Sequence, residues 1–160
     1  MTMLNAISTA ASRTACEIIA AEQAQAPILA VMLASHLAEL GAPTDYPYLS
    51  CYWQEPERYP LFIRLDTQII GFALVREISP GTDFELAEFY IEVQARRRGH
   101  GAAAVRQLFS LFTGSWHLAV SLTNTAGLQF WRATLKGLAV ESPASKPGYL
   151  SFHVKSNRGT

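Results

Sequence analysis

The stretch from residue 61 to residue 112 constrains the fold of this chain more than any other. Residues 61–65 and 69–78 are rich in β-branched and aromatic side chains and are separated by three residues, the spacing of a β-hairpin. Residues 84–93 have the same character and follow a Pro-Gly turn, so the sequence predicts three consecutive antiparallel strands. A loop at residues 96–101, Arg-Arg-Arg-Gly-His-Gly, then precedes a helical pattern at residues 102–112.

Segments on either side complete the predicted fold. Residues 27–40 carry leucines at helical spacing between Pro27 and Gly41, which indicates a helix. A second helix is predicted at residues 126–135, and strands are predicted at residues 16–20, 116–122 and 149–154. The fold class is therefore α+β, a mixed and mainly antiparallel sheet flanked by helices.

Size and charge narrow the class of protein. A chain of 160 residues, 49% of them hydrophobic, fits one folded domain; we expect it to span residues 16–155, between a loose arm (1–15) and a tail (156–160). The formal net charge is 0, whereas proteins that bind nucleic acid or anionic membranes through bulk charge are basic. No apolar run is long enough to cross a bilayer, and the two cysteines are too far apart for a closely spaced metal-ligand pair. We expect a cytoplasmic protein with no metal, nucleic-acid or membrane partner.

The loop at residues 96–101 carries the clearest chemistry. Gly99 and Gly101 allow a close approach of the backbone to an anion, and the helix that follows begins with unpaired amides that carry partial positive charge. Together these features predict a cradle for a diphosphate. The pattern is neither the Gly-x-Gly-x-x-Gly of dinucleotide-binding folds nor the Gly-Lys-Ser/Thr of nucleoside-triphosphate loops.

The order of a strand, Arg96-x-x-Gly99-x-Gly101, a helix, a strand, Asn124 and Phe130-Trp131 resembles the GNAT superfamily of N-acetyltransferases, and most of all its small bacterial members. The resemblance covers residues 16–154 in the order of elements and residues 84–138 in motif detail. It implies that the loop binds the pyrophosphate of acetyl-CoA, and that the strand before it splays from its neighbour to accept the pantetheine arm. The cofactor-binding residues that it implies are Phe89, Tyr90, Ile91, Val93, Arg96, Arg97, Arg98, Gly99, His100, Gly101, Ala102, Asn124 and Trp131.

Two glutamates on the strand before the loop are candidate catalytic bases, because acetyl transfer needs a neutral amine. Glu85 matches the position of the base in histone-type members of the superfamily. Glu88 lies nearer the expected splay and fits the Glu-Phe-Phe-Val pattern of the small enzymes. Residues three apart point to opposite faces of an unbroken strand, so we expect only one of them to face the substrate, and we favour Glu88.

The family's common general acid is a tyrosine at the position that Trp131 occupies here. An indole cannot act as an acid at neutral pH, so protonation of the departing thiolate falls to water or to another residue such as Tyr90 or Tyr149. Asn124 resembles the residue that hydrogen-bonds the cofactor arm, and it also stands where it could cap the next helix.

Residues 43–60 place five aromatic side chains among four prolines, which predicts an irregular, shaped loop. Its residues Tyr46, Tyr48, Tyr52 and Trp53 either cover the core or line a substrate pocket. For His36, within the first predicted helix, a surface or packing role is favoured over a catalytic one.

The leading functional prediction is an acyltransferase that moves an acetyl group from acetyl-CoA to a primary amine of a small molecule by direct attack on the thioester. The alternatives are a protein or peptide N-acetyltransferase and a non-catalytic relative that binds acyl-CoA as a sensor. A single-stranded nucleic-acid binder is disfavoured by the zero net charge. The exposed final strand of such folds also permits a homodimer.

Overall fold

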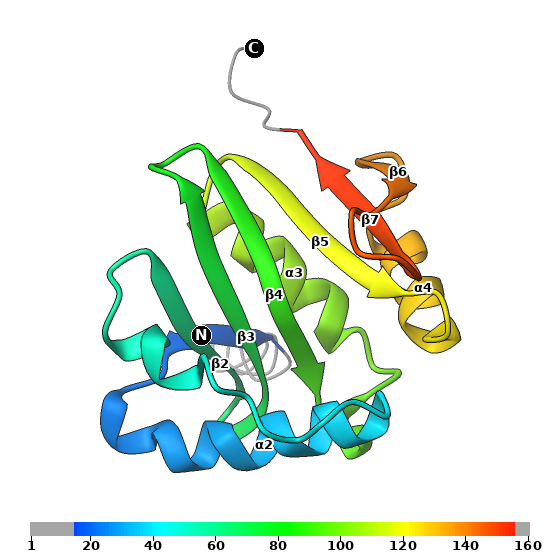
Figure 1. The fold of residues 1–160 in the computed structure, drawn as a ribbon. Helices are drawn as coiled ribbons and strands as arrows, with labels where there is room; N and C mark the ends of the chain where they lie inside the picture. The colour runs from blue at the N-terminus through cyan, green and yellow to red at the C-terminus, as the bar shows by residue number, and fades with distance from the viewer. Residues whose placement is uncertain (1–14, 156–160) are drawn as a thin grey trace, which may run out of the picture.

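Seven strands form one sheet in the order β1-β2-β3-β4-β5-β7-β6 (Figure 1). The computed structural model describes residues 15–155; the expected N-terminal arm, apart from Ala15, and the expected tail lie outside the described residues. Every neighbouring pair of strands is antiparallel except β4 and β5. The strands are β1 (Cys16–Ala20), β2 (Arg58–Leu65), β3 (Gln68–Ser79), β4 (Asp83–Ile91), β5 (Ser115–Ser121), β6 (Ala139–Pro143) and β7 (Tyr149–Val154).

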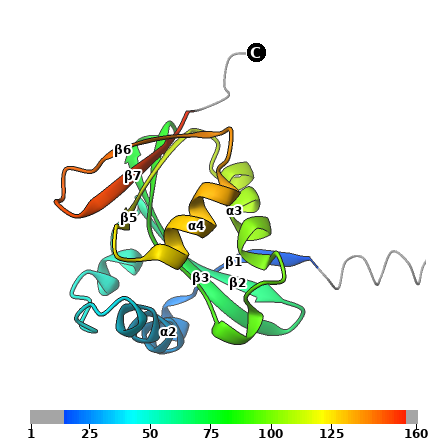
Figure 2. The same cartoon turned by 90° about the vertical axis from the view of Figure 1, so that its right-hand side faces the viewer.

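Within residues 15–155, three α-helices cover the two faces of the sheet. Helix α2 (Ala26–Glu39) lies on one face, and α3 (His100–Leu111) and α4 (Thr125–Thr134) lie on the other (Figure 2). Short 3-10 turns, η1 (Gln23–Gln25), η2 (Leu49–Trp53) and η3 (Val93–Ala95), join the elements. None of the helices within residues 15–155 is long and apolar enough to span a bilayer. The predicted α+β class is confirmed.

Strand β3 is buried on both faces, which explains its continuous apolar sequence. Phe72 and Leu74 pack into the cluster beneath α2, and Ala73 and Val75 pack into the cluster beneath α3 and α4. Successive side chains of a strand point to opposite faces, so one central strand serves both layers of the core. Gly71 lies where the backbone carbonyl of Tyr90 on β4 leaves no room for a Cβ atom.

The structure differs from the predicted strands in two places: it contains one strand that was not predicted, and another strand ends early. β6 was not predicted from the sequence, because its residues are mostly exposed and end at Pro143, so they carry no alternating apolar signal. The third predicted strand ends earlier than expected: β4 stops at Ile91, and Val93 lies in η3. Val93 is 60% exposed, so it does not continue the buried strand.

Candidate active site

The parallel pair β4 and β5 separates soon after it begins. Only Asp83, Phe84 and Glu85 pair with β5, where their partners are residues 115–117. Beyond Glu85 the two strands diverge, as Figure 1 shows, while β5 continues to pair with β7 on its other edge, over residues 116–121. The expected splayed central pair is therefore present. The edge of β4 from residue 86 to residue 91, which includes Phe89, Tyr90 and Ile91, faces the splay without a β5 partner, and backbone groups in such an edge can bind an extended ligand.

The glycine loop leads from the open end of β4 into α3. Arg97 and Gly99 both adopt left-handed backbone conformations, with φ of 63° and 82°, and Gly99 is the N-cap of α3. The first backbone hydrogen bond across this cap runs from the Ala103 amide to the Gly99 carbonyl at 3.1 Å. Within the described residues the amides of residues 98–102 donate to no backbone carbonyl, so they are able to bind an anion.

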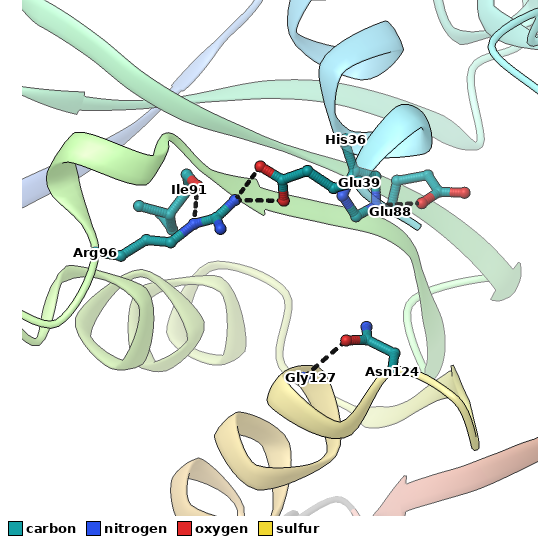
Figure 3. Close-up of polar contacts among 7 residues, drawn as sticks. All are labelled: His36, Glu39, Glu88, Ile91, Arg96, Asn124 and Gly127. Carbon is teal, nitrogen blue, oxygen red and sulfur yellow. Dashed lines mark hydrogen bonds and ion pairs between the residues drawn. The ribbon is translucent and has the colours of Figure 1, made fainter. Parts of the chain in front are cut away.

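The three arginines of the loop differ in what they contact. Arg96 donates its Nε–H to the carbonyl of Ile91 at 2.7 Å, and it donates from Nη2 to the Glu39 carboxylate at 2.8 and 3.1 Å (Figure 3). Its guanidinium also lies over the Tyr90 ring, 5.4 Å from the centroid. Arg97 and Arg98 are exposed and form no ion pair with any residue from 15 to 155. The geometry therefore makes Arg96 a brace between β4 and α2, and leaves Arg97 and Arg98 as the available cations.

Gly101 allows α3 and α4 to approach each other closely. A Cβ atom at Gly101 would lie 2.9 Å from Cε2 of Phe130, which is closer than carbon atoms pack. Phe130 in turn stacks on Phe89 of β4, with ring centroids 5.9 Å apart. The second glycine of the loop is thus required by packing, whereas Gly99 is required by its backbone conformation.

Asn124 and Trp131 both have structural roles. Oδ1 of Asn124 accepts a hydrogen bond from the Gly127 amide at 3.0 Å, so the residue caps α4. Trp131 is 7% exposed and packs its ring edge-on against Phe89, with centroids 5.4 Å apart. Within the described residues the indole is a core group on the α3 and α4 side of β4.

Both candidate glutamates lie on the same face of β4, which corrects the expectation that they point to opposite faces. The pairing of β4 with β3 shifts between Val75↔Leu86 and Leu74↔Glu88, so Ala87 is an extra, bulged residue. Because of the bulge, Leu86 and Phe89 both pack towards α3 and α4 although they are three residues apart. Glu85 and Glu88 therefore both face α2 and the aromatic segment that follows it.

His36 is a site residue that sequence reasoning did not predict. Its Nε2 lies 2.9 Å from Oε2 of Glu88, and the two side chains are 14% and 20% exposed (Figure 3). The imidazole packs on Phe72 and Tyr90, with ring centroids 6.0 and 5.6 Å away. His36 follows Leu29, Met32 and Leu33 on the buried stripe of α2, and this spacing is the signal that could have placed it against the sheet.

The aromatic segment divides into residues that face the glutamates and residues that do not. Burial raises the pKa of Tyr46, and Tyr52 and Glu88 raise it further. Burial also raises the pKa of Tyr52; Arg58 opposes this shift and Glu85 adds to it. Both hydroxyls thus stay protonated at neutral pH and lie near the two carboxylates.

Tyr48 and Trp53 belong to the part of the aromatic segment that does not face the two glutamates. Tyr48 is 61% exposed, and Trp53 donates its indole N–H to the carbonyl of Ala21 at 2.9 Å, which holds it towards β1. A hollow of about 460 Å³ adjoins Trp53 and Tyr52 at the start of β2, but neither glutamate lines it. Of the four predicted wall residues, Tyr46 and Tyr52 are the two that the structure brings towards Glu88 and Glu85.

The two tyrosines named as replacement acids lie on different strands, β4 and β7. Tyr90 is buried on β4, where burial raises its pKa, Glu39 adds to the shift and Arg96 opposes it. Tyr149 begins β7, and its hydroxyl accepts a hydrogen bond from Nζ of Lys146 at 3.3 Å. Both hydroxyls remain candidate proton donors.

The chain is similar to known proteins in sequence pattern and in fold. The sequence profile described as the acetyltransferase (GNAT) family matches residues 28–135, which is more than half of the chain. No curated protein sequence matches it significantly.

Many solved structures share its fold, and three of them illustrate the likeness. An acetyltransferase from Thermus thermophilus superposes with a TM-score of 0.73 at 16% identity, over 88% of this chain and 97% of that one. The PaiA N-acetyltransferase from Thermoplasma acidophilum, in complex with coenzyme A, gives a TM-score of 0.67 at 13% identity, over 88% and 99% of the two chains. A GNAT family acetyltransferase from Elizabethkingia anophelis with acetyl-CoA bound gives 0.64 at 11% identity, over 88% and 97%.

Proposed function

Because the chain belongs to the acetyltransferase (GNAT) family, we propose that it transfers the acetyl group of acetyl-CoA to the primary amine of a small molecule, with Glu88 as the base. The observation that carries this proposal is the splay of β4 from β5. The splay lies between the glycine loop at one end of β4 and the face of β4 that bears Glu88 and Glu85. Strand β4 therefore connects a site that suits an anionic, extended acyl donor with a carboxylate that can accept a proton.

The residues present fit acetyl-CoA as the acyl donor. The amides of residues 98–102 and the exposed cations Arg97 and Arg98 suit a pyrophosphate, and the unpaired edge of β4 suits an amide-containing arm. When bound, acetyl-CoA supplies an acetyl thioester whose thiolate is a good leaving group. Two structures of the same fold contain coenzyme A or acetyl-CoA, which supports the assignment.

The protein's own groups prepare the amine. An ammonium ion cannot attack a carbonyl carbon, so a base must first remove a proton. Glu88 is partly buried on the face of β4 opposite α3 and α4, with Tyr46 and Tyr52 nearby. A backbone amide of the splayed strand would stabilise the oxyanion of the tetrahedral intermediate. The limited exposure of Glu88 favours a small amine or a chain end over the side of a folded protein.

The experiment is release of free coenzyme A thiol from acetyl-CoA with a panel of amines: spermidine, glycinamide and a tripeptide with a free N-terminus. Glu88→Gln should lower kcat about 100-fold or more and change the acetyl-CoA Kd less than twofold. Glu85→Gln is the matched control, a carboxylate on the same face that pairs with Arg76 at 3.7 Å, and it should retain most of the rate. Acetyl-CoA binding without thiol release for any amine would favour the sensor instead, and a rate confined to the tripeptide would favour the peptide acetyltransferase.

A further inference from the structure

We propose that His36 is the positioning residue of the catalytic base: its Nε2–H holds Oε2 of Glu88 and leaves Oε1 free to take the proton of the amine. This inference rests on the proposed function and assigns a role to a residue of α2. It is carried by the 2.9 Å contact between the two side chains.

The direction of the hydrogen bond follows from the charge of Glu88 and not from the distance alone. When the carboxylate is ionised it only accepts, so Nε2 carries the proton and Oε2 accepts it. Among residues 15–155, Oε1 of Glu88 forms no hydrogen bond, and in Figure 3 it points away from His36. A long glutamate side chain held at one oxygen has lost most of its rotamer freedom, so the other oxygen has a defined position.

The surroundings hold the imidazole in place. Its ring packs edge-on against Phe72 of β3 and is tilted against Tyr90 of β4, so two neighbouring strands hold it against the sheet. His36 also lies three residues before Glu39, which binds Arg96, so two successive contacts fasten the end of α2 to β4 and its loop. The titratable and charged groups that face the pair or adjoin it are Glu39 on α2, Tyr46 in the aromatic segment, Tyr90 on β4, Glu92 directly after β4, and Arg96 in the loop.

The proton balance is simple. The ammonium loses one proton to Oε1 of Glu88, and the neutral nitrogen forms a bond to the acetyl carbon. As the carbon–sulfur bond breaks, the second nitrogen-bound proton passes to the thiolate, directly or through water, and Glu88 returns its proton to solvent. The products are the acetamide, free thiol and one proton.

The test compares two substitutions of His36. In His36→Gln the amide can still donate to Glu88, and in His36→Ala the donor is lost. We expect His36→Gln to keep kcat/KM within about threefold of wild type. His36→Ala should lose about tenfold in kcat. Rescue by the conservative variant separates a hydrogen-bond donor from a side chain that only fills space.

A second readout needs no substrate. A histidine N–H that is hydrogen-bonded to a carboxylate is protected from exchange with solvent. NMR should therefore show a downfield imidazole Nε2–H signal that Glu88→Ala removes and Glu85→Ala retains. An equal loss of kcat in His36→Gln and His36→Ala, full activity in His36→Ala, or an NMR signal that persists in Glu88→Ala would overturn the inference. If wild type turned over no amine in the panel while the NMR signal behaved as expected, the proposed function would fail and the contact itself would stand.

Discussion

Nη2 of Arg96 lies 2.8 Å from Oε2 of Glu39, which ties the loop after β4 to the last turn of α2. The same guanidinium holds the carbonyl of Ile91, the last residue of β4. The family resemblance implied that Arg96 lends charge to the phosphates. Its contacts are also those of a residue that sets the shape of the loop, whereas Arg97 and Arg98 form no ion pair with any of residues 15–155.

Substitution of Glu39 distinguishes these two roles of Arg96. If Arg96 braces the loop, Glu39→Ala should weaken acetyl-CoA binding by about fivefold, because the loop loses a fixed end. If Arg96 contacts phosphate directly, its release from Glu39 should leave binding unchanged or stronger. The measurement is calorimetric titration with acetyl-CoA. Glu17→Ala, which removes the exposed ion pair to Arg64 at 2.7 Å, is the matched control and should have no effect on binding.

Gly101 should tolerate no larger residue while Phe130 stays in place. Gly101→Ala would push its methyl group against the Phe130 ring and should lower the free energy of unfolding by about 1–3 kcal/mol. The double substitution Gly101→Ala with Phe130→Leu should lose less than the sum of the two single changes, because the smaller side chain makes room. Denaturant unfolding of the four proteins gives the coupling, and strict additivity would contradict the packing argument.

Asn124 offers a way to separate helix capping from cofactor binding. Asn124→Ala removes the acceptor for the Gly127 amide and should cost about 1 kcal/mol of stability. Asn124→Asp keeps an acceptor at the cap and should restore thermal stability. If the side-chain amide also binds the cofactor arm, as the family resemblance implies, Asn124→Asp should still bind acetyl-CoA more weakly than wild type. Equal affinity would restrict the residue to capping.

The stacked histidines of β5 and β7 predict a pH dependence of stability. The rings of His117 and His153 lie 4.3 Å apart, and burial, His117 and Lys155 together lower the pKa of His153, with Asp83 opposing. The unfolded chain then binds a proton at His153 more readily than the folded one. Stability should fall as the pH drops through about 6.5, the unperturbed value for histidine. His153→Gln should lose less between pH 7 and pH 5 in denaturant unfolding, and an equal loss would contradict the assignment.

The sequence predicts the fold well wherever burial leaves a pattern. The apolar run of β3, the order of strand, glycine loop and helix, and the caps of α2 all describe local structure that the neighbouring residues determine. β6 was not predicted because its five residues are mostly exposed and therefore show no alternation of apolar and polar side chains. Its pairing with β7 is a tertiary contact that local sequence does not indicate.

The site was harder to predict because it depends on one bulge. Ala87 moves Glu88 onto the face of Glu85, and the apolar positions 84, 86, 89 and 91 shift phase at that point in the sequence. The contact from His36 to Glu88 joins residues 52 apart in the chain, so no local spacing could have revealed it. The buried stripe of α2 could have placed His36 against the sheet, but not against that carboxylate.

Calorimetric titration of acetyl-CoA into the purified protein tests the central claim most directly, because it measures the anion cradle before any amine is chosen. We predict micromolar binding, about −8 kcal/mol, that Gly99→Glu abolishes by placing a carboxylate beside the free amides of the loop. Gly81→Glu, a glycine with φ of 68° in the turn between β3 and β4, is the control for backbone strain and should bind normally. Absence of binding by the wild-type protein, or equal binding by Gly99→Glu, would contradict the account.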